Sequence, residues 1–215
     1  QVDETVCAVM LEPVQGEGGI VPADAGYLKS VRDLCTQKGI LLIFDEIQCG
    51  MGRCGHLFAH QLYNITPDIM TLAKALGNGL PIGAMLATKE AATGFDFGSH
   101  ASTFGGTPLV TAAALEVINI ISSESFLEDV RQKGRYFQNK LIELKEKHSR
   151  IVAIRGEGLL IGLEIDKDAA FFVRKLMEKG FIINGIQDKV LRFAPPLIIE
   201  KTDIDRLITT LDSLF

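Results

Sequence analysis

The chain has 215 residues, of which 47% are apolar and 23% charged, and its 22 basic and 27 acidic side chains give a net charge of −5. This length accommodates one large domain, or one domain and a smaller one, around a buried core. The apolar composition excludes a disordered acidic tail, and the acidic balance argues against nucleic-acid binding through a basic face. No run of about 18 apolar residues occurs, which excludes a membrane-spanning helix.

The four cysteines, Cys7, Cys35, Cys49 and Cys54, form no Cys-x-x-Cys pair and lie among apolar residues or glycines. They predict reduced thiols in a cytoplasmic protein rather than a disulfide framework. The polar and acidic start of the chain lacks the basic residues of a signal peptide. Because the first residue is Gln1 and not Met, we expect the chain to be part of a longer one.

Apolar runs alternate with helical patterns over residues 1–120, which predicts an α/β domain with a parallel-rich sheet. The strand predicted at 40–44 leads directly into Asp45 and Glu46, so it would deliver carboxylates at its carboxyl end. Gly39 would end the helix that precedes it. Strands are expected at 7–11, 40–44, 68–73 and 82–87, and helices at 23–38 and 107–121.

A long helical pattern at 124–148, charged on one face, is typical of a connector between domains. The order strand, strand, helix, strand, strand, helix then predicts a small α+β domain. The predicted division is a large-domain portion at 1–120, a connecting helix at 121–150 and a small domain at 151–215. The elements of the small domain are expected at 151–154, 159–165, 168–179, 181–183, 190–193 and 202–214.

The apolar run that ends on Asp45 and Glu46 also resembles a Walker B strand, whose Asp binds magnesium. That interpretation requires a Gly-x-x-x-x-Gly-Lys-Ser/Thr loop to bind phosphates, and the sequence has none. His56 and His60 have the helical spacing of metal ligands, but no third ligand accompanies them, so we predict no metal site.

The glycine-rich segment at 16–19 lacks the dinucleotide-binding fingerprint and its acidic ribose partner. It is therefore interpreted as a flexible loop that carries Glu17. No internal repeat or low-complexity stretch is present.

Lys74 directly follows the predicted strand at 68–73 and lies among Leu, Ala and Gly residues. Such a lysine is expected to project into a cleft, where desolvation makes its amine easier to deprotonate and able to form a Schiff base with an aldehyde. Together with Asp45 at a strand end, it meets the needs of pyridoxal phosphate chemistry. A carboxylate against the ring nitrogen keeps the ring protonated and electron-withdrawing.

Five motifs occur in order along the chain and carry a specific resemblance. They are EPVQGEGG at 12–19, FDEIQCGMGR at 44–53, LAKALGNG at 72–79, STFGGTP at 102–108 and RFAPPL at 192–197. In this order they resemble the class III aminotransferases of the ornithine and acetylornithine type, and the stretch QCGM is most similar to the acetylornithine branch. The resemblance covers nearly the whole chain. It implies an α/β fold, the aspartate-aminotransferase fold type I, with part of the large domain and a small C-terminal α+β domain.

The resemblance also implies a role for each residue that matches a family motif. Asp45 would pair with the pyridine nitrogen of the cofactor, and Lys74 would bind the cofactor covalently as the catalytic residue. Ile47 would pack against one face of the ring, and Gln48 would hydrogen-bond its phenolic oxygen. Thr103 would bind the cofactor phosphate in the neighbouring subunit's site, which implies a homodimer.

Arg192 and Glu17 are the substrate-binding residues that the resemblance implies. Arg192 would bind the α-carboxylate of glutamate or 2-oxoglutarate, and Glu17 would cover Arg192 when the substrate reacts through its terminal amine. Glu46 and Arg53 would have structural hydrogen-bond or ion-pair roles.

The implied activity is the transfer of the terminal amine of N-acetylornithine, or of another N-acylornithine, to 2-oxoglutarate with pyridoxal 5'-phosphate as cofactor. The products would be the semialdehyde and glutamate, in arginine biosynthesis. The implied partners are these small molecules and a second copy of the chain, with no nucleic acid and no membrane, in the cytoplasm.

Other interpretations stay open at the level of sequence. Taken singly, Asp45 could cap a helix, Thr103 could be a turn hydroxyl and Glu17 a solvated carboxylate. Arg192 could be a strand arginine paired to a core carboxylate. An ornithine or 4-aminobutyrate aminotransferase would use the same lysine, aspartate and glutamine. Since class III enzymes are considerably longer and take half of the phosphate site from their N-terminal part, the chain could also be a catalytically inactive dimerising fragment.

Overall fold

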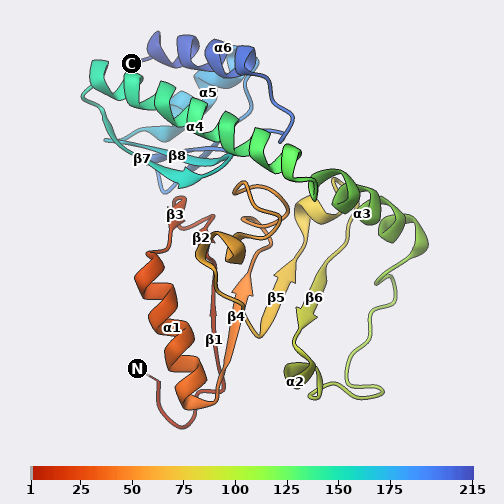
Figure 1. Cartoon of the computed structure of the whole chain (residues 1–215). Coiled ribbons are helices and arrows are strands. Elements are labelled where there is room, and N and C mark those ends of the chain that lie inside the picture. Colours follow the sequence, from red (N-terminus) through yellow and green to blue (C-terminus); the bar gives the residue numbers. More distant parts are fainter. Residues whose placement is uncertain (1) are drawn as a thin grey trace. The chain divides into compact units, whose positions relative to one another are not determined.

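The computed structural model of the chain describes residues 2–215 (Figure 1). The chain divides into two compact units. The first unit comprises residues 2–13, 23–52 and 56–123, and the second comprises 14–22, 53–55 and 124–215. Two short segments from the N-terminal part of the chain therefore belong to the second unit.

The first unit is built on a four-stranded sheet with the strand order β1-β4-β5-β6. β1 (Ala8–Leu11), β4 (Leu41–Asp45) and β5 (Ile69–Leu72) run parallel, and β6 (Ala84–Ala87) pairs antiparallel with β5. The predicted α/β fold with a parallel-rich sheet is thus confirmed. β6 reverses direction because only a short 3-10 helix, η2 (Lys74–Leu76), and a glycine-rich turn connect it to β5. A parallel return needs a crossover of about a dozen residues or more.

α1 (Ala25–Lys38) covers one face of this sheet (Figure 1). The helix begins where the Asp24 carboxylate accepts a 2.8 Å hydrogen bond from Tyr27 N. It ends, as predicted, at Gly39, whose φ of 65° lies in the left-handed region that glycine adopts without strain. The buried residues between helix and sheet are Leu28, Cys35, Leu42, Phe44 and Ile65.

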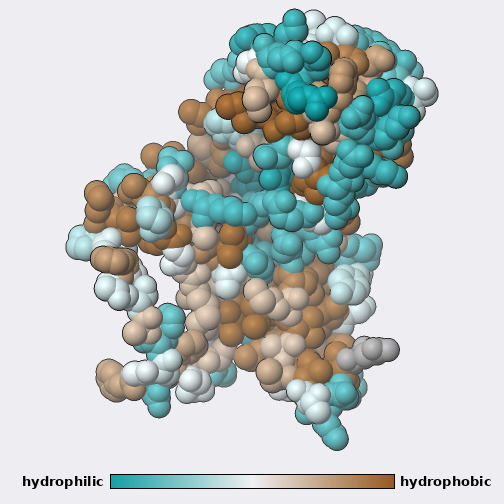
Figure 2. Space-filling model, turned by 180° about the vertical axis from the view of Figure 1, so that it is seen from behind, coloured by the Kyte–Doolittle hydropathy of each residue, from teal (hydrophilic) through white to brown (hydrophobic). Residues whose placement is uncertain are grey.

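The opposite face of the sheet carries apolar side chains that remain exposed. Met10 in β1 is 58% exposed and Met85 in β6 is 47% exposed. The strand register places both of them on the face that also carries Asp45. Figure 2 shows apolar side chains gathered on the first unit.

Three further helical segments complete the first unit. They are η1 (Ala59–Tyr63), α2 (Lys89–Ala92) and α3 (Pro108–Ile121). The connection between α2 and α3 contains no regular element, and side chains such as Phe97 and Phe104 are exposed there. The predicted helix at 107–121 is confirmed by α3.

The second unit contains an antiparallel four-stranded sheet with the strand order β7-β8-β10-β9. Its strands are β7 (Ile151–Glu157), β8 (Leu160–Ile165), β9 (Asn184–Ile186) and β10 (Val190–Phe193). A small two-stranded sheet, β2 (Val14–Gln15) with β3 (Val21–Pro22), belongs to the same unit.

Three helices cover one face of the four-stranded sheet (Figure 1). They are α4 (Glu124–Lys147), α5 (Ala169–Glu178) and α6 (Lys201–Asp212). Their apolar residues and those of the strands form one buried core, which includes Phe137, Leu141, Leu163, Phe172, Leu191 and Ile204. Burial of these side chains is the main stabilising contribution to the unit.

One predicted strand of this unit is wrong. No strand forms at 181–183, and β9 forms three residues later. Phe181 and Ile183 pack against the core from the connection that follows α5. Their apolar character therefore reflects burial and not strand pairing, which a short apolar run cannot distinguish.

The helix predicted as a connector between domains packs within the second unit. Phe137 and Leu141 of α4 are buried in the core described above. The division at 1–120, 121–150 and 151–215 stays a prediction, and the compact units differ from it at α4 and in segments 14–22 and 53–55.

Across residues 2–215, no single helix is long and apolar enough to cross a bilayer. α3 and α4 meet the requirement of length and composition only when the two are counted together.

Candidate active site

The carboxyl ends of β4 and β5 form a polar edge of the first unit's sheet. Asp45 is the last residue of β4, is half-buried, and lies beside Thr71 of β5 in the strand register. Its Oδ1 accepts a 2.9 Å hydrogen bond from Ile47 N. This bond orients the Asp45 carboxylate at the strand end, which is where ligands bind in open α/β sheets.

Thr71 is a candidate residue that sequence analysis missed. Among residues 2–215, its Oγ1 is the buried side-chain polar atom that has no hydrogen-bond partner. Leaving a buried hydroxyl unsatisfied costs roughly 1–3 kcal/mol. The only signal in the sequence was one hydroxyl within the apolar strand β5. Its place beside Asp45 depends on the strand register, which the sequence does not display.

Glu46 ties the turn after β4 to the start of η1. Its side chain is fully buried, and its two oxygens accept hydrogen bonds of 2.5 Å from Ala59 N and 2.7 Å from His60 N. Burial raises the pKa of Glu46 to about 7, against the lowering effect of these two bonds. The structural role expected for Glu46 is therefore present as a pair of backbone hydrogen bonds.

Ile47 and Gln48 lie in the turn that Glu46 anchors, and both are half-buried. The turn closes through a 2.9 Å hydrogen bond from Gly50 N to Glu46 O. A Cβ at position 50 would lie 2.7 Å from that same oxygen, so the turn requires glycine there. The contacts of the Glu46 carboxylate and the bond between Glu46 and Gly50 together fix the backbone that carries the two predicted cofactor-binding side chains.

Lys74 begins η2, three residues after Thr71, and so lies at the carboxyl end of the strand next to Asp45's. Its φ of 42° lies in the left-handed region, which is uncommon for a residue with a Cβ. Such strain persists where the surrounding structure enforces it, and it occurs often at functional sites. Lys74 is exposed, so the desolvation expected from its apolar neighbours is not provided by residues 2–215.

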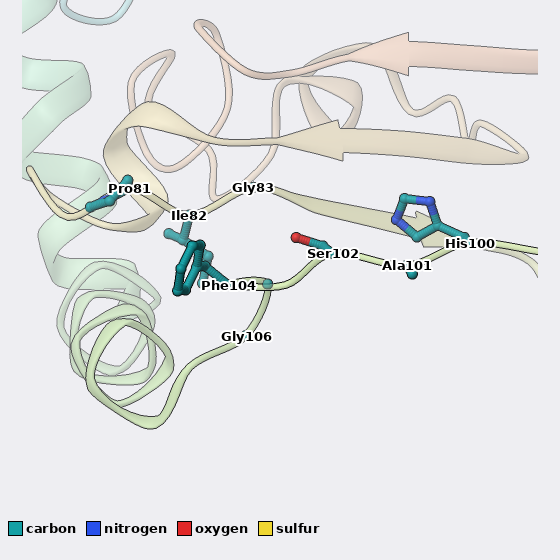
Figure 3. A pocket seen from close by; sticks show the side chains of 9 residues that line it. Pro81, Ile82, Gly83, His100, Ala101, Ser102, Phe104 and Gly106 are labelled. Carbon is teal, nitrogen blue, oxygen red and sulfur yellow. The ribbon is translucent and has the colours of Figure 1, made fainter. Parts of the chain in front are cut away.

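Thr103 lies in the exposed connection between α2 and α3. Segments 100–106 and 81–83 line an open hollow of about 710 Å³ (Figure 3). Thr103 itself is not one of the lining residues, whereas its neighbours Ser102 and Phe104 are. Thr103 is exposed in this connection and shares the first unit with Asp45 and Lys74.

In the second unit, the structure brings Glu17 and Arg192 together. The Arg192 guanidinium donates through Nη1 to Glu17 Oε1 in an ion pair. The Arg192 side chain is 14% exposed and that of Glu17 is 75% exposed. A mostly buried cation on β10 therefore has a solvent-exposed carboxylate as its partner.

Arg53 is bound within the second unit to backbone carbonyl groups. Its Nη1 donates to Pro195 O at 2.5 Å and to Leu159 O at 3.2 Å. Burial lowers the pKa of Arg53 to about 10. These bonds hold the segment that follows β10, in keeping with the structural role expected for Arg53.

His60, one of the two histidines with helical spacing, contacts a backbone carbonyl group. His60 Nδ1 lies 2.9 Å from Ile65 O, and burial lowers the pKa of the His60 ring. Among residues 2–215, no group of three or more His, Cys, Asp or Glu side chains is placed to hold a metal ion.

The family of the chain is decided by comparison with known proteins. A model of the family "Aminotransferase class-III" matches residues 1–215. The chain belongs to the class III aminotransferases. Its α/β architecture is that of fold type I.

The chain is similar to several named relatives. It is 52% identical, over 214 residues, to the acetylornithine aminotransferase of Methanocaldococcus jannaschii, covering 100% of this chain and 54% of that protein. The N-acetylornithine aminotransferase structure from Stenotrophomonas maltophilia matches with a TM-score of 0.88 and 38% identity, covering 97% of this chain and 56% of that one. The ornithine δ-aminotransferase structure from Plasmodium falciparum matches with a TM-score of 0.92 and 33% identity, covering 98% and 56%. The chain spans about half the length of the curated relatives it matches.

The side chains at the ends of β4 and β5 fit the ring of a pyridoxal cofactor. Asp45 can accept a hydrogen bond from a protonated ring nitrogen, and Lys74 supplies a primary amine at the end of the next strand. The unpartnered Thr71 hydroxyl adds a buried polar atom beside Asp45 that a ligand can satisfy. This set offers one acid, one amine and one hydroxyl at a single sheet edge.

Proposed function

We propose that the full protein transfers the terminal amine of N-acetylornithine, or of another N-acylornithine, to 2-oxoglutarate with pyridoxal 5'-phosphate as cofactor, in arginine biosynthesis. The observation that carries this proposal is the ion pair between Glu17 and Arg192. While Glu17 occupies Arg192, a substrate's α-carboxylate has no free cation there. That arrangement favours amine donors that react through a terminal amine. The similarity to named acetylornithine aminotransferases supports the same substrate class.

The residues of the first unit would bind the cofactor and transfer the proton. When bound, pyridoxal phosphate withdraws electrons from the carbon that bears the reacting amine. Lys74 would hold the cofactor, and once the substrate amine displaces it, its Nζ would take the proton from that carbon and later return it. Asp45 would accept a hydrogen bond from the ring nitrogen. Ile47 would pack against the ring, and Gln48 would donate to its phenolic oxygen.

The residues of the second unit would separate the two halves of the reaction. In the first half, Glu17 would stay on Arg192, and the donor would bind by its terminal amine. In the second half, Glu17 would leave, and the Arg192 guanidinium would bind the α-carboxylate of 2-oxoglutarate through two parallel hydrogen bonds. Glutamate would then leave as product. The exposed position of Glu17 supports this exchange.

The proposal extends to the assembly. Thr103 would bind the cofactor phosphate in the site of a neighbouring subunit, so that two copies of the chain form a homodimer in the cytoplasm. Residues 1–120 would contribute to the large domain, 121–150 would connect, and 151–215 would form the small domain. The exposed position of Thr103 is compatible with a role in a second copy.

The test is glutamate formation from 2-oxoglutarate by the purified full protein with each of three donors, N-acetylornithine, ornithine and 4-aminobutyrate. We expect the highest kcat/KM with N-acetylornithine. Lys74→Ala should abolish turnover with every donor, whereas Lys89→Ala, at an exposed lysine of α2, should not. No glutamate from any donor would overturn the proposal.

Ornithine is a second candidate donor, because the chain resembles an ornithine δ-aminotransferase with a TM-score of 0.92. A higher kcat/KM for free ornithine than for the acylated form would favour it. The interpretation as an inactive dimerising fragment predicts that residues 1–215 alone form dimers without turnover, while the full protein is active.

A further inference from the structure

The loop that carries Glu17 lies on the face of the second unit's sheet that is turned away from the helices. In the strand register, Arg155 of β7 is opposite Gly162 of β8, and Gly162 is opposite Arg192 of β10. Register neighbours project from the same face of a sheet. Two arginines therefore flank a glycine in one row, and the loop at 16–20 crosses that row.

Gly162 permits the loop to approach the sheet. A Cβ at this position would lie 2.9 Å from Ile20 Cβ and 3.3 Å from Gly19 O. Ile20 is fully buried and has a φ of 56°, which is a strained conformation for a β-branched residue. Close packing against the sheet is what keeps Ile20 in that conformation.

Arg155 holds the backbone of the same loop. Its Nε donates a 3.0 Å hydrogen bond to Gly19 O, and its Nη1 donates to the Glu164 carboxylate in an ion pair. Glu164 lies two residues along β8 from Gly162, on the same face of the sheet. Because the guanidinium is planar and its donors are fixed in a fork, the ion pair with Glu164 also aims Nε at the loop.

We propose that Arg155 is a positioning residue for Glu17. By holding Gly19 O above Gly162, it keeps the Glu17 carboxylate on Arg192 and so biases the enzyme toward donors that react through a terminal amine. Releasing Gly19 O would shift the loop toward positions in which Arg192 is free to bind an α-carboxylate. The inference rests on the proposed function, since it assigns the selection between the two half-reactions to this loop.

The chain offers a matched control for Arg155. Arg150 also divides its guanidinium between a carboxylate and a carbonyl group, with Nε 3.0 Å from Asp166 Oδ1 and Nη2 3.2 Å from Lys167 O. It belongs to the same unit and makes these contacts away from the Glu17 loop. Lysine at either position can keep the ion pair but cannot reach both acceptors with a planar fork.

The first measurement is each half-reaction of the full, cofactor-loaded protein in a single turnover. Arg155→Lys is expected to lower kcat/KM for N-acetylornithine about tenfold and to raise kcat/KM for glutamate a few-fold, because a charged hydrogen bond to the loop is lost. Arg150→Lys should change neither value. An equal fall of both half-reactions in Arg155→Lys would overturn the proposal, because it would indicate general structural damage.

A double-mutant cycle with Glu17→Gln tests whether Arg155 acts through Glu17. In the Glu17→Gln background, Arg155→Lys should leave the ratio of the two kcat/KM values unchanged. A change of that ratio as large as in the wild-type background would mean that Arg155 acts independently of Glu17, and the proposal would be wrong.

Amide hydrogen exchange supplies a readout that does not depend on activity. Arg155→Lys should accelerate exchange at Gly19 and Ile20 about tenfold, and Arg150→Lys should not. Unchanged exchange at these two amides would overturn the proposal even in a protein that turns over neither donor. If exchange is accelerated but the full protein catalyses neither half-reaction, the anchoring of the loop by Arg155 is supported and the proposed function is wrong.

Discussion

Glu46 is a buried carboxylate next to Asp45, and its environment makes stability depend on pH. Burial raises its pKa from 4.5 to about 7. Since the folded-state pKa exceeds the unfolded value, the unfolded state releases its proton first. The stability that the protonated form contributes is complete below about pH 4.5 and is lost as pH rises through about 7.

We therefore expect Glu46→Gln to remove this pH dependence. The unfolding free energy of the wild type, relative to the variant, should fall by on the order of 3 kcal/mol between about pH 4.5 and pH 8. Urea unfolding of the full protein across that range measures it. Glu90→Gln, at an exposed carboxylate, is the control. The prediction would be wrong if the difference in unfolding free energy between the wild type and Glu46→Gln stayed constant across this pH range.

The unpartnered hydroxyl of Thr71 gives a second residue-scale prediction. Thr71→Val replaces that hydroxyl with a methyl group of similar volume, so the cofactor-free protein should gain about 1 kcal/mol of unfolding free energy. Thr71→Ser keeps the hydroxyl and loses the methyl group, and it should be less stable than the wild type. If Thr71→Val is instead less stable than the wild type, the Thr71 hydroxyl has a hydrogen-bond partner in solution.

At the scale of elements, α4 contacts the β7–β8 turn so closely that one glycine is required. A Cβ on Gly134 would lie 2.3 Å from Gly158 O. Alanine would gain about 1 kcal/mol of helix propensity, but overpacking against backbone that cannot move aside costs roughly 1–3 kcal/mol. The steric cost should exceed the gain in helix propensity, so we expect Gly134→Ala to lower the thermal midpoint of the full protein. Glu146→Ala, exposed on the same helix, should not lower it.

The same scale shows what sequence patterns can and cannot predict. α1 was predictable because Asp24 and Gly39 mark its ends and its apolar residues follow a helical period. β10 was predicted with its bounds, since a short apolar run lies between polar segments. The strand expected at 181–183 failed, because buried connections and strands share the same apolar composition.

Some residues of the candidate site could be predicted from the sequence and others could not. Asp45 and Lys74 could be selected from the sequence, because an acid at a strand end and a lysine among small residues are local patterns. Thr71 and Arg155 could not, since their significance comes from a strand register and from a loop about 135 residues distant in sequence. Sequence motifs indicate the residues that carry the chemistry, whereas tertiary contacts determine which other residues orient them.

At the scale of the whole molecule, the proposed role of Thr103 in a neighbouring subunit can be tested by mixing subunits. Lys74→Ala removes the lysine of a subunit's own site, and Thr103→Val removes a phosphate ligand from its neighbour's site. A mixed dimer would then hold one site with both defects and one site with neither. We expect it to show about half the activity of the wild-type dimer, because the sites of a symmetric dimer are equivalent.

If Thr103 served its own subunit, the mixed dimer would contain one site without the lysine and one with a weakened phosphate contact. Its activity would then not exceed half that of the Thr103→Val dimer. Tagging the two subunits differently allows the mixed species to be purified and assayed at limiting cofactor, where loss of a phosphate ligand lowers occupancy most. A control mixture of Lys74→Ala with Thr93→Val, at another exposed threonine before α3, should match the Lys74→Ala and wild-type mixture. Recovery of activity only in the Thr103 mixture, relative to its parent dimers, would locate the phosphate contact across the subunit boundary.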